Sequence, residues 1–359
     1  MSKIYRIRNF SAAGLLAVPI ILSGCSGFSK ESMDVDPPPA QQEAQMLQTM
    51  NGLVAPDGAT KTTAGSPTAT VYLSNPNGLL APVSLALPQS DDKNIGASLR
   101  VALESIVKDG LYKDLIPEGF TGVLPAGTEV KNVSVEKEKK LAIVEFSKPF
   151  VTYDAKNERA MLEAITWTLT GDASIEHVQI WVDGEKLTQM PINQTPLDHS
   201  LGREFGINLE KGEGASYLTS SPVVVYFSAL SPTGIQYYVP ITRLVESGEN
   251  KLHTALGELI HGPGIRGSLE QVMTSGTSLE SVKTAKDGTV TVALKDDMFA
   301  EGEQVPQEML QSVVLTVAEN AGNPKVKIQL NGTTPVIGLD QLNYSEPVSR
   351  PEYINEIPL

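Results

Sequence analysis

Apolar residues recur along the chain in two stripes of identical spacing. They fall at i, i+3, i+4, i+7 and i+8, first as Leu99, Ala102, Leu103, Ile106 and Val107, then as Leu252, Ala255, Leu256, Leu259 and Ile260. This spacing puts each set on one face of an α-helix. Gly110 follows the first stripe and Gly262-Pro263 the second, and both are residues that end helices. The pattern therefore predicts two matching amphipathic helices.

A second matching pair lies further along each half of the chain. Residues 161–169 and 309–317 predict helices, and each is followed by an alternating strand that ends in Asp183-Gly184 or Asn331-Gly332. Both dipeptides favour tight turns because their residues tolerate positive φ. The helix and the turn are separated by the same number of residues in both halves. We interpret this constant register as a duplication.

Predicted hairpins complete the duplicated unit, which reads strand, strand, helix, strand, strand, helix, strand. The expected fold class is α+β, with two tandem homologous domains, each a mixed or antiparallel sheet with helices packed on one face. We place the domains at 69–191 and 221–338, joined by a connector at 192–220 and followed by a C-terminal tail at 339–359.

The N-terminus has the layout of a bacterial lipoprotein signal. Lys3, Arg6 and Arg8 form a basic segment, residues 10–22 are apolar, and Leu22-Ser23-Gly24-Cys25 is a lipobox. We expect residues 1–24 to be removed and Cys25 to carry a diacylglyceryl group and fatty acids such as palmitate. An ordinary secretory signal with an incidental cysteine is the alternative.

Residues 25–68 are poor in large apolar side chains and are expected to form a disordered tether. Beyond the signal, no apolar stretch approaches the ~18 residues that a membrane-spanning helix needs. The expected location is the extracytoplasmic face of the cell membrane, with the lipid on Cys25 as the anchor.

Charge and cysteine content exclude several classes of function. The chain of 359 residues has a formal net charge of -14, which disfavours binding to nucleic acid. Cys25 is the only cysteine, so its acylation would leave no thiol for disulfides, thiolate metal sites or nucleophilic catalysis.

No motif predicts a cofactor or a metal site. Gly262, Gly264 and Gly267 spell GxGxxG, but a predicted helix precedes them where a nucleotide fingerprint needs a strand, and Pro263 lies inside the motif. We interpret the glycines as a helix end and a loop. The four histidines lack the spacing of a zinc pair.

Catalytic carboxylates are not indicated either. Acids of the first unit change in the second: Glu104, Glu145, Glu163 and Asp183 become Gly257, Ala293, Gln311 and Asn331. We interpret these acids as parts of solvated faces, and we expect no enzyme. A wall hydrolase that lost its site in one unit is the alternative.

Two residues are candidates for partner binding. Trp181 alternates with Ile180 and Val182, so it is expected to point away from the buried face of its strand. An exposed tryptophan is typical of a ligand or protein contact. Packing under a loop or the connector is the other interpretation, and it applies to Trp167 as well. Arg243 is the second candidate, restricted to the second unit because Leu85 is its counterpart.

Several segments together resemble the GerMN domain, present twice. They include Val239-Pro240-Ile241-Thr242-Arg243, Leu259-Ile260-His261-Gly262-Pro263, Pro125-Ala126-Gly127-Thr128, residues 165–170, and residues 178–182 with Asp183-Gly184. The resemblance implies a non-catalytic protein of sporulation and spore germination, on the membrane that surrounds the spore. Envelope or sporulation proteins are the expected partners, and peptidoglycan binding or cleavage is the alternative.

Overall fold

The structure is a computed structural model that describes residues 68–88, 94–211, 220–246, 250–264, 268–300, 302–332 and 335–359. The predicted signal, Cys25 and residues 26–67 lie outside the described residues. In the described part of the chain, no helix is both long and apolar enough to cross a membrane.

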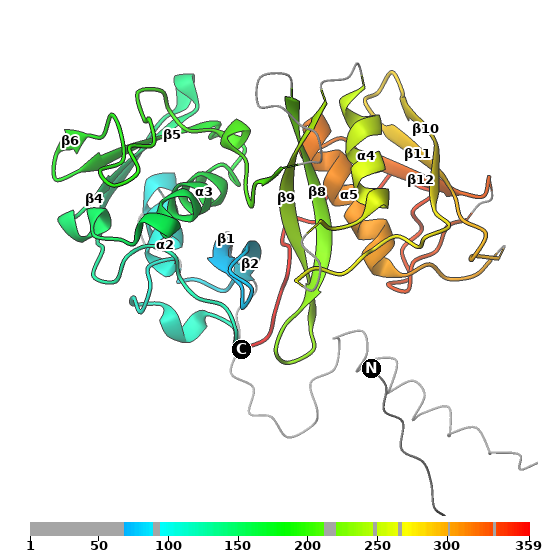
Figure 1. The fold of residues 1–359 in the computed structure, drawn as a ribbon, viewed down its shortest axis with the longest axis horizontal. Coiled ribbons are helices and arrows are strands. Elements are labelled where there is room, and N and C mark those ends of the chain that lie inside the picture. The colour runs from blue at the N-terminus through cyan, green and yellow to red at the C-terminus, as the bar shows by residue number, and fades with distance from the viewer. Residues whose placement is uncertain are drawn as a thin grey trace, which may run out of the picture. The chain divides into compact units, whose positions relative to one another are not determined.

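The first repeat begins with a two-stranded hairpin and continues into a four-stranded sheet with two α-helices (Figure 1). Its elements are β1 (Ala69–Ser74), β2 (Leu80–Leu85), α2 (Ile95–Ser105), β3 (Val130–Glu136), β4 (Leu141–Phe146), α3 (Glu158–Leu169), β5 (His177–Val182) and β6 (Glu185–Lys186).

The second repeat has the same order of elements, with a longer front hairpin. Its elements are β8 (Ser220–Leu230), β9 (Gln236–Glu246), α4 (Lys251–His261), β10 (Ser278–Thr284), β11 (Val290–Lys295), α5 (Gln307–Ala321) and β12 (Val326–Leu330). The short strand β7 (Glu210–Lys211), from the connector, pairs in parallel with β9.

Both sheets are mixed. β4 and β5 are paired parallel neighbours that α3 connects along the chain, and α5 connects the parallel neighbours β11 and β12 in the same way. β3 pairs antiparallel with β4, and β10 pairs antiparallel with β11. The predicted order of strands and helices occurs in both repeats, which confirms the α+β class and the tandem arrangement.

The helix face, the helix end and the turn that the sequence predicted are found at the predicted residues. The apolar stripe of α2 is buried along its whole length, and α4 ends at His261 with Gly262 at φ 90°. Asp183 and Gly184, at φ 48° and 85°, form the two-residue turn between β5 and β6. Both have positive φ, as the turn chemistry of an Asp-Gly hairpin requires.

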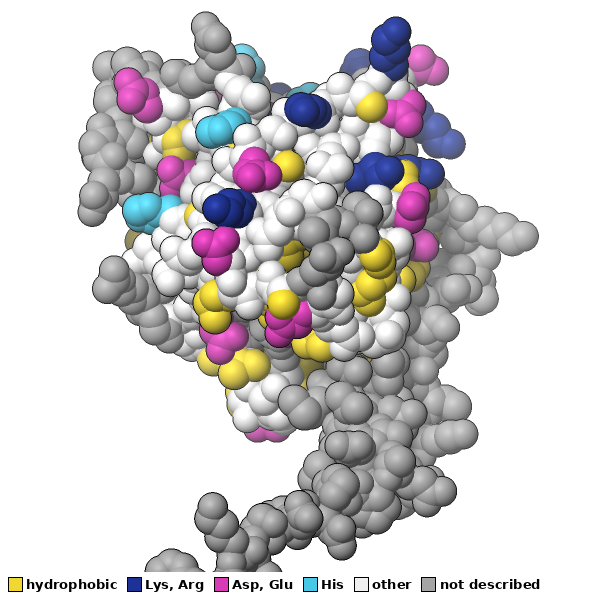
Figure 2. All heavy atoms as spheres, turned by 90° about the vertical axis from the view of Figure 1, so that its right-hand side faces the viewer, with side chains coloured by type: hydrophobic (Ala, Val, Ile, Leu, Met, Phe, Trp, Pro, Cys, Tyr) yellow, Lys and Arg dark blue, Asp and Glu magenta, His cyan; other side chains and the backbone are white. Residues whose placement is uncertain are grey.

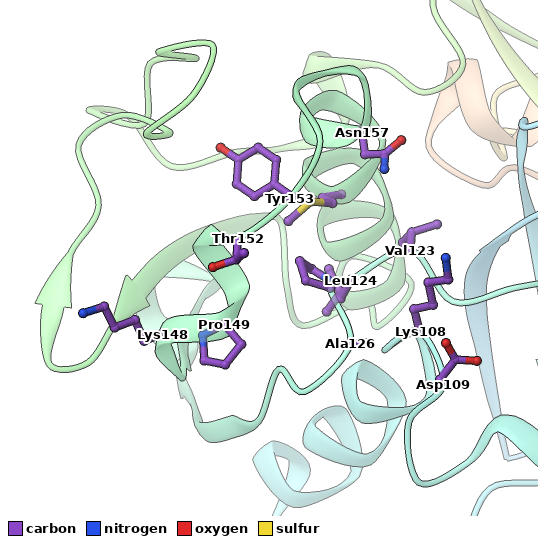
Figure 3. A pocket seen from close by; sticks show the side chains of 12 residues that line it. Lys108, Asp109, Val123, Leu124, Ala126, Lys148, Pro149, Thr152, Tyr153 and Asn157 are labelled. Atoms are coloured by element: carbon purple, nitrogen blue, oxygen red, sulfur yellow. The ribbon is translucent and has the colours of Figure 1, made fainter.

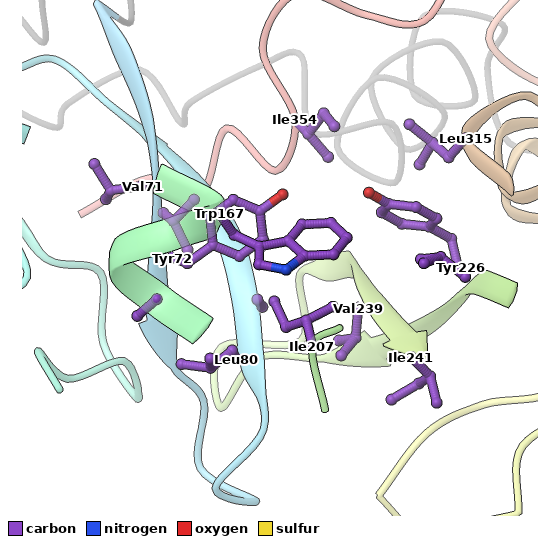
Figure 4. Close-up of a cluster of buried hydrophobic side chains, with 14 of the residues drawn as sticks. Val71, Tyr72, Leu80, Trp167, Ile207, Tyr226, Val239, Ile241, Leu315 and Ile354 are labelled. Carbon is purple, nitrogen blue, oxygen red and sulfur yellow. The ribbon is translucent and has the colours of Figure 1, made fainter. Parts of the chain in front are cut away.

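Most buried apolar side chains form one cluster that draws on both repeats. Figure 4 shows its centre, where Trp167 of the first repeat and Tyr226 of the second lie near Ile207 and Ile354. Ile207 belongs to the predicted connector and Ile354 to the predicted tail. Residues around Ile207 and Ile354 are therefore docked, because each position contributes an apolar side chain to the common core.

Candidate functional site

Trp181 lies on the outer face of the first sheet. Along β5, Val178 and Ile180 are buried at 1% and 2% exposure, whereas Trp181 is half-buried. The indole Nε1 donates to Gln179 Oε1 at 2.9 Å, and Glu145 and Lys186 are its neighbours across the strands. The side chain thus points away from the core, as the alternation of the strand predicted.

Trp167 is the opposite case, because it is fully buried under the connector. Its Nε1 donates to the backbone oxygen of Gly206 at 2.9 Å, and the guanidinium of Arg203 lies 4.4 Å from its ring centre. For Trp167, packing under the connector is therefore correct. The two tryptophans thus differ in burial although both lie in the first repeat.

Arg243 lies inside the second repeat, with only 4% of its side chain exposed. Its Nε donates to Glu210 Oε2 at 2.8 Å, one terminal nitrogen to Glu258 Oε2 at 2.8 Å, and the other to the backbone oxygen of Gly262 at 2.8 Å. The arginine thus fastens β7 and the end of α4 to β9. The counterpart Leu85 is buried too, so the same position serves packing in the first repeat.

Glu163 corrects the expectation that the acids which change between the repeats lie on solvated faces. It is 3% exposed, forms an ion pair with Arg159 at 2.7 Å, and accepts the backbone N–H of Asn208 at 3.0 Å. Burial raises the pKa of Glu163, although Arg159 and the N–H of Asn208 act against the shift. Sequence periodicity missed this burial because the connector, a distant segment, covers α3.

Glu158 also holds the connector, although no motif in the sequence marks it as a contact residue. The carboxylate is completely buried and accepts hydrogen bonds from Tyr153 Oη at 2.7 Å and the backbone N–H of Asn193 at 2.8 Å. Burial raises its pKa, but the hydrogen bonds from Thr195, Asn193 and Tyr153 outweigh that effect and lower it. Pro306 occupies the corresponding place before α5.

A hollow of about 700 Å³ opens between two loops of the first repeat (Figure 3). Val123, Leu124 and Met161 provide apolar lining, and Lys108 and Lys148 add positive charge. Other lining residues are Asp109, Pro125, Ala126, Pro149, Thr152, Tyr153 and Asn157. No local pattern in the sequence indicates this hollow, because its lining comes from segments that become neighbours only in the folded chain.

In the second repeat, Asp296 occupies the position of Lys148 and ties the corresponding loop down. Its Oδ2 accepts the hydroxyl of Thr277 at 2.6 Å and that of Thr274 as well. Burial raises the pKa of Asp296, but the hydroxyl hydrogen bonds prevail and lower it. The contrast between Lys148 and Asp296 was visible in the sequence and distinguishes the repeats at this loop.

Cys25 lies outside the described residues, so its predicted lipidation stays a prediction. Among the described residues, no group of three or more His, Cys, Asp or Glu side chains is placed to hold a metal ion.

Comparison with known proteins agrees with the tandem fold. The family named Germane, described as "Sporulation and spore germination", matches residues 70–188 and 224–336. The chain is 31% identical to the spore germination protein GerM of Bacillus subtilis (strain 168), over 96% of each chain. The solved tandem GerMN domains of GerM from Bacillus subtilis superpose with a TM-score of 0.73 and 33% identity, covering 80% of this chain and 99% of that one. With both repeats matched and the relative aligned almost end to end, this chain belongs to the Germane family of sporulation and spore germination proteins.

Proposed function

We propose that this protein is a non-catalytic, lipid-anchored envelope protein that acts in sporulation and germination by binding other proteins. The outer face of the first sheet, around Trp181, is the proposed contact surface. The lipid on Cys25 would hold the protein at the extracytoplasmic side of the membrane that surrounds the spore.

The observation that carries this proposal is a difference between the two sheets. On the outer face of the first sheet, Ile143 and Trp181 are half-buried apolar side chains on neighbouring strands. At the same positions of the second sheet stand Thr291 and Gln329. Aromatic side chains with partial exposure are preferred anchors of protein interfaces. At these two positions the first sheet is therefore apolar and the second is polar.

Figure 2 shows one face of the second repeat, which carries charged and apolar side chains side by side. Acidic and basic side chains are interspersed there, and yellow apolar side chains are scattered among them. Scattered apolar side chains are normal for a protein surface and do not by themselves indicate an interface.

Crosslinking pull-down from sporulating cells tests the proposal directly. Trp181→Gln, which introduces the residue of the second repeat, should abolish capture of envelope proteins and fail to restore sporulation in a deletion strain. Gln329→Ala, on the matching strand of the second repeat, is the control and should behave like the parent. Equal capture by parent and Trp181→Gln protein at equal abundance would refute the proposed surface.

The hollow beside Lys148 favours a second candidate function, the binding of peptidoglycan. Its apolar lining and the polar groups of Thr152 and Asn157 are suited to a sugar or a peptide stem. Retention of the parent protein on purified sacculi, lost in Lys148→Glu protein, would support this function. Release of wall fragments would instead require an enzyme and contradict the non-catalytic proposal.

A further inference from the structure

The two segments that follow the repeats have the same layout. We name residues 201–211 the connector arm and residues 348–359 the C-terminal arm. Leu201 pairs with Val178 and Val348 pairs with Val326, so both arms leave their own repeat beside the equivalent strand. From there, Arg203, Ile207 and Asn208 follow in the connector arm with the same spacing as Arg350, Ile354 and Asn355 in the C-terminal arm.

Asn208 joins the front hairpins of the two repeats, which are β1–β2 in the first repeat and β8–β9 in the second. Its Oδ1 accepts the backbone N–H of Leu80 at 2.8 Å, and its Nδ2 donates to the backbone oxygens of Leu80 at 2.7 Å and Pro240 at 2.8 Å. Leu80 lies on β2 and Pro240 on β9. One side chain thus forms hydrogen bonds with backbone groups of both strands.

Asn355 makes the reciprocal set of contacts. Its Oδ1 accepts the backbone N–H of Tyr238 at 2.8 Å, and its Nδ2 donates to the backbone oxygens of Tyr238 at 2.8 Å and Pro82 at 2.7 Å. Tyr238 precedes Pro240 as Leu80 precedes Pro82. The three hydrogen bonds of Asn208 therefore recur with the two repeats exchanged.

The isoleucine before each asparagine follows the same reciprocity. The N–H of Ile207 donates to Thr242 Oγ1 at 2.8 Å, and the N–H of Ile354 donates to Ser84 Oγ at 2.9 Å. Thr242 and Ser84 each stand two residues after the proline of their hairpin. Both isoleucine side chains enter the buried cluster in Figure 4.

These contacts describe a self-complementary interface with crossed arms. The connector arm binds β9 of the second repeat through Thr242, and the C-terminal arm binds β2 of the first repeat through Ser84. Matching surfaces that exchange equivalent elements are the hallmark of isologous, two-fold association. Within one chain, the two repeats thus associate as the subunits of a dimer with exchanged arms would.

We infer that the seam between the two front hairpins, formed by β2 of the first repeat and β9 of the second, is a binding groove for an extended peptide that contains Ile-Asn. Residues 350–357 fill it within the chain, and the same segment of a second copy can fill it from outside. Recognition rests on the backbone groups of Pro82 and Tyr238 and the hydroxyl of Ser84. Strand-like addition through backbone hydrogen bonds is a common way to bind extended peptides. The arm of a second copy would restore every contact of the arm it replaces.

Competition between the arm and a free peptide tests the inference. The probe is a fluorescent peptide of residues 349–359, and the full chain carries Cys25→Ser to remove the acylation site. Asn355→Ala in the chain should weaken its own arm and raise affinity for the probe at least tenfold over the chain with Asn355. The same substitution in the probe should lower that affinity at least tenfold. Equal affinities, or binding of a scrambled peptide as tight as the probe, would overturn the inference.

Two measurements on the chain with an intact arm complete the test without a destabilising substitution. The amide of Ile354 should exchange with solvent faster than global unfolding allows, since the arm must leave before another copy enters. Light scattering should detect a fraction of dimer that increases with protein concentration and decreases when the peptide is added. Exchange of Ile354 only through global unfolding, or a monomer at every concentration, would refute arm exchange.

Discussion

Arg203 donates two hydrogen bonds to the carboxylate of Glu319, at 2.6 and 2.7 Å, and thereby ties the connector to α5 of the second repeat. Arg350 of the C-terminal arm donates to the same carboxylate at 2.7 Å and to Tyr226 Oη at 3.2 Å. Glu319 is therefore the common acceptor for both arms. The counterpart in the first repeat is Gly171, so this charged cluster has no equivalent there.

Glu319→Gln should destabilise the protein by about 3 kcal/mol, because removing one partner leaves two largely buried arginines without their counter-charge. Urea unfolding monitored by circular dichroism measures the change. Glu352→Gln, an exposed acid in the C-terminal arm, should change the free energy of unfolding by less than about 0.5 kcal/mol. Similar effects of the two substitutions would show that the Glu319 cluster contributes little.

The same cluster predicts a dependence of stability on pH. Burial raises the pKa of Glu319, but Arg203 and Arg350 outweigh that effect and lower it to about 2. Since the folded-state pKa lies below the unfolded value, the contribution is present above the ordinary glutamate range and is lost as pH falls toward about 2. Unfolding measured between pH 7 and pH 2 should show a steeper acid loss for the parent than for Glu319→Gln protein.

Glu163→Gln should leave the protein as stable as the parent at neutral pH, or more stable. Burial raises the pKa of Glu163, so folding favours the protonated carboxyl, and the stability that the protonated form contributes is lost as pH rises through the folded-state pKa. Glutamine retains an acceptor for the N–H of Asn208, and Gln311 already stands at this position in the second repeat. Thermal melts at pH 5 and pH 8 check this. A large loss of stability at pH 8 would mean that the ion pair with Arg159 outweighs the cost of burial.

Substitutions of the two tryptophans should have different effects, one on stability and the other on partner binding. Trp167→Leu, which introduces the residue found at position 315, should cost about 3 kcal/mol because it leaves a cavity and removes the bond to Gly206. Trp181→Gln should shift the free energy of unfolding by less than about 1 kcal/mol, since its side chain is half-exposed. Denaturant melts of both variants test this. A strongly destabilised Trp181→Gln protein would make any loss of partner capture uninformative.

Cys25→Ser should release the protein from the membrane fraction or leave it unprocessed. Two acyl chains contribute about 0.8 kcal/mol for each buried methylene, which makes anchoring stable, whereas one chain binds only marginally. Membrane fractionation and the apparent mass of the product report the outcome. Unchanged fractionation and processing of the variant would exclude the lipoprotein interpretation.

Sequence alone predicted the features that depend on near neighbours along the chain. The stripe beginning at Leu99 defined a buried helix face, and Asp183-Gly184 defined a turn, because helix period and positive φ are local properties. The alternation around Trp181 also gave its direction correctly. These local signals recur in both halves, and that recurrence was enough to predict two α+β repeats.

Tertiary structure decided which side chains of those elements are covered. Glu163 and Arg243 carry charges and gave no local sign of burial, yet a distant segment or an opposed carboxylate encloses each. The same holds for Asn208 and Asn355, whose partners on the front hairpins lie between 32 and 273 residues away along the chain. A local pattern determines which face of an element is buried. Only the fold brings distant donors and acceptors within hydrogen-bonding distance. The association of the two repeats through crossed arms was therefore decided by the tertiary structure.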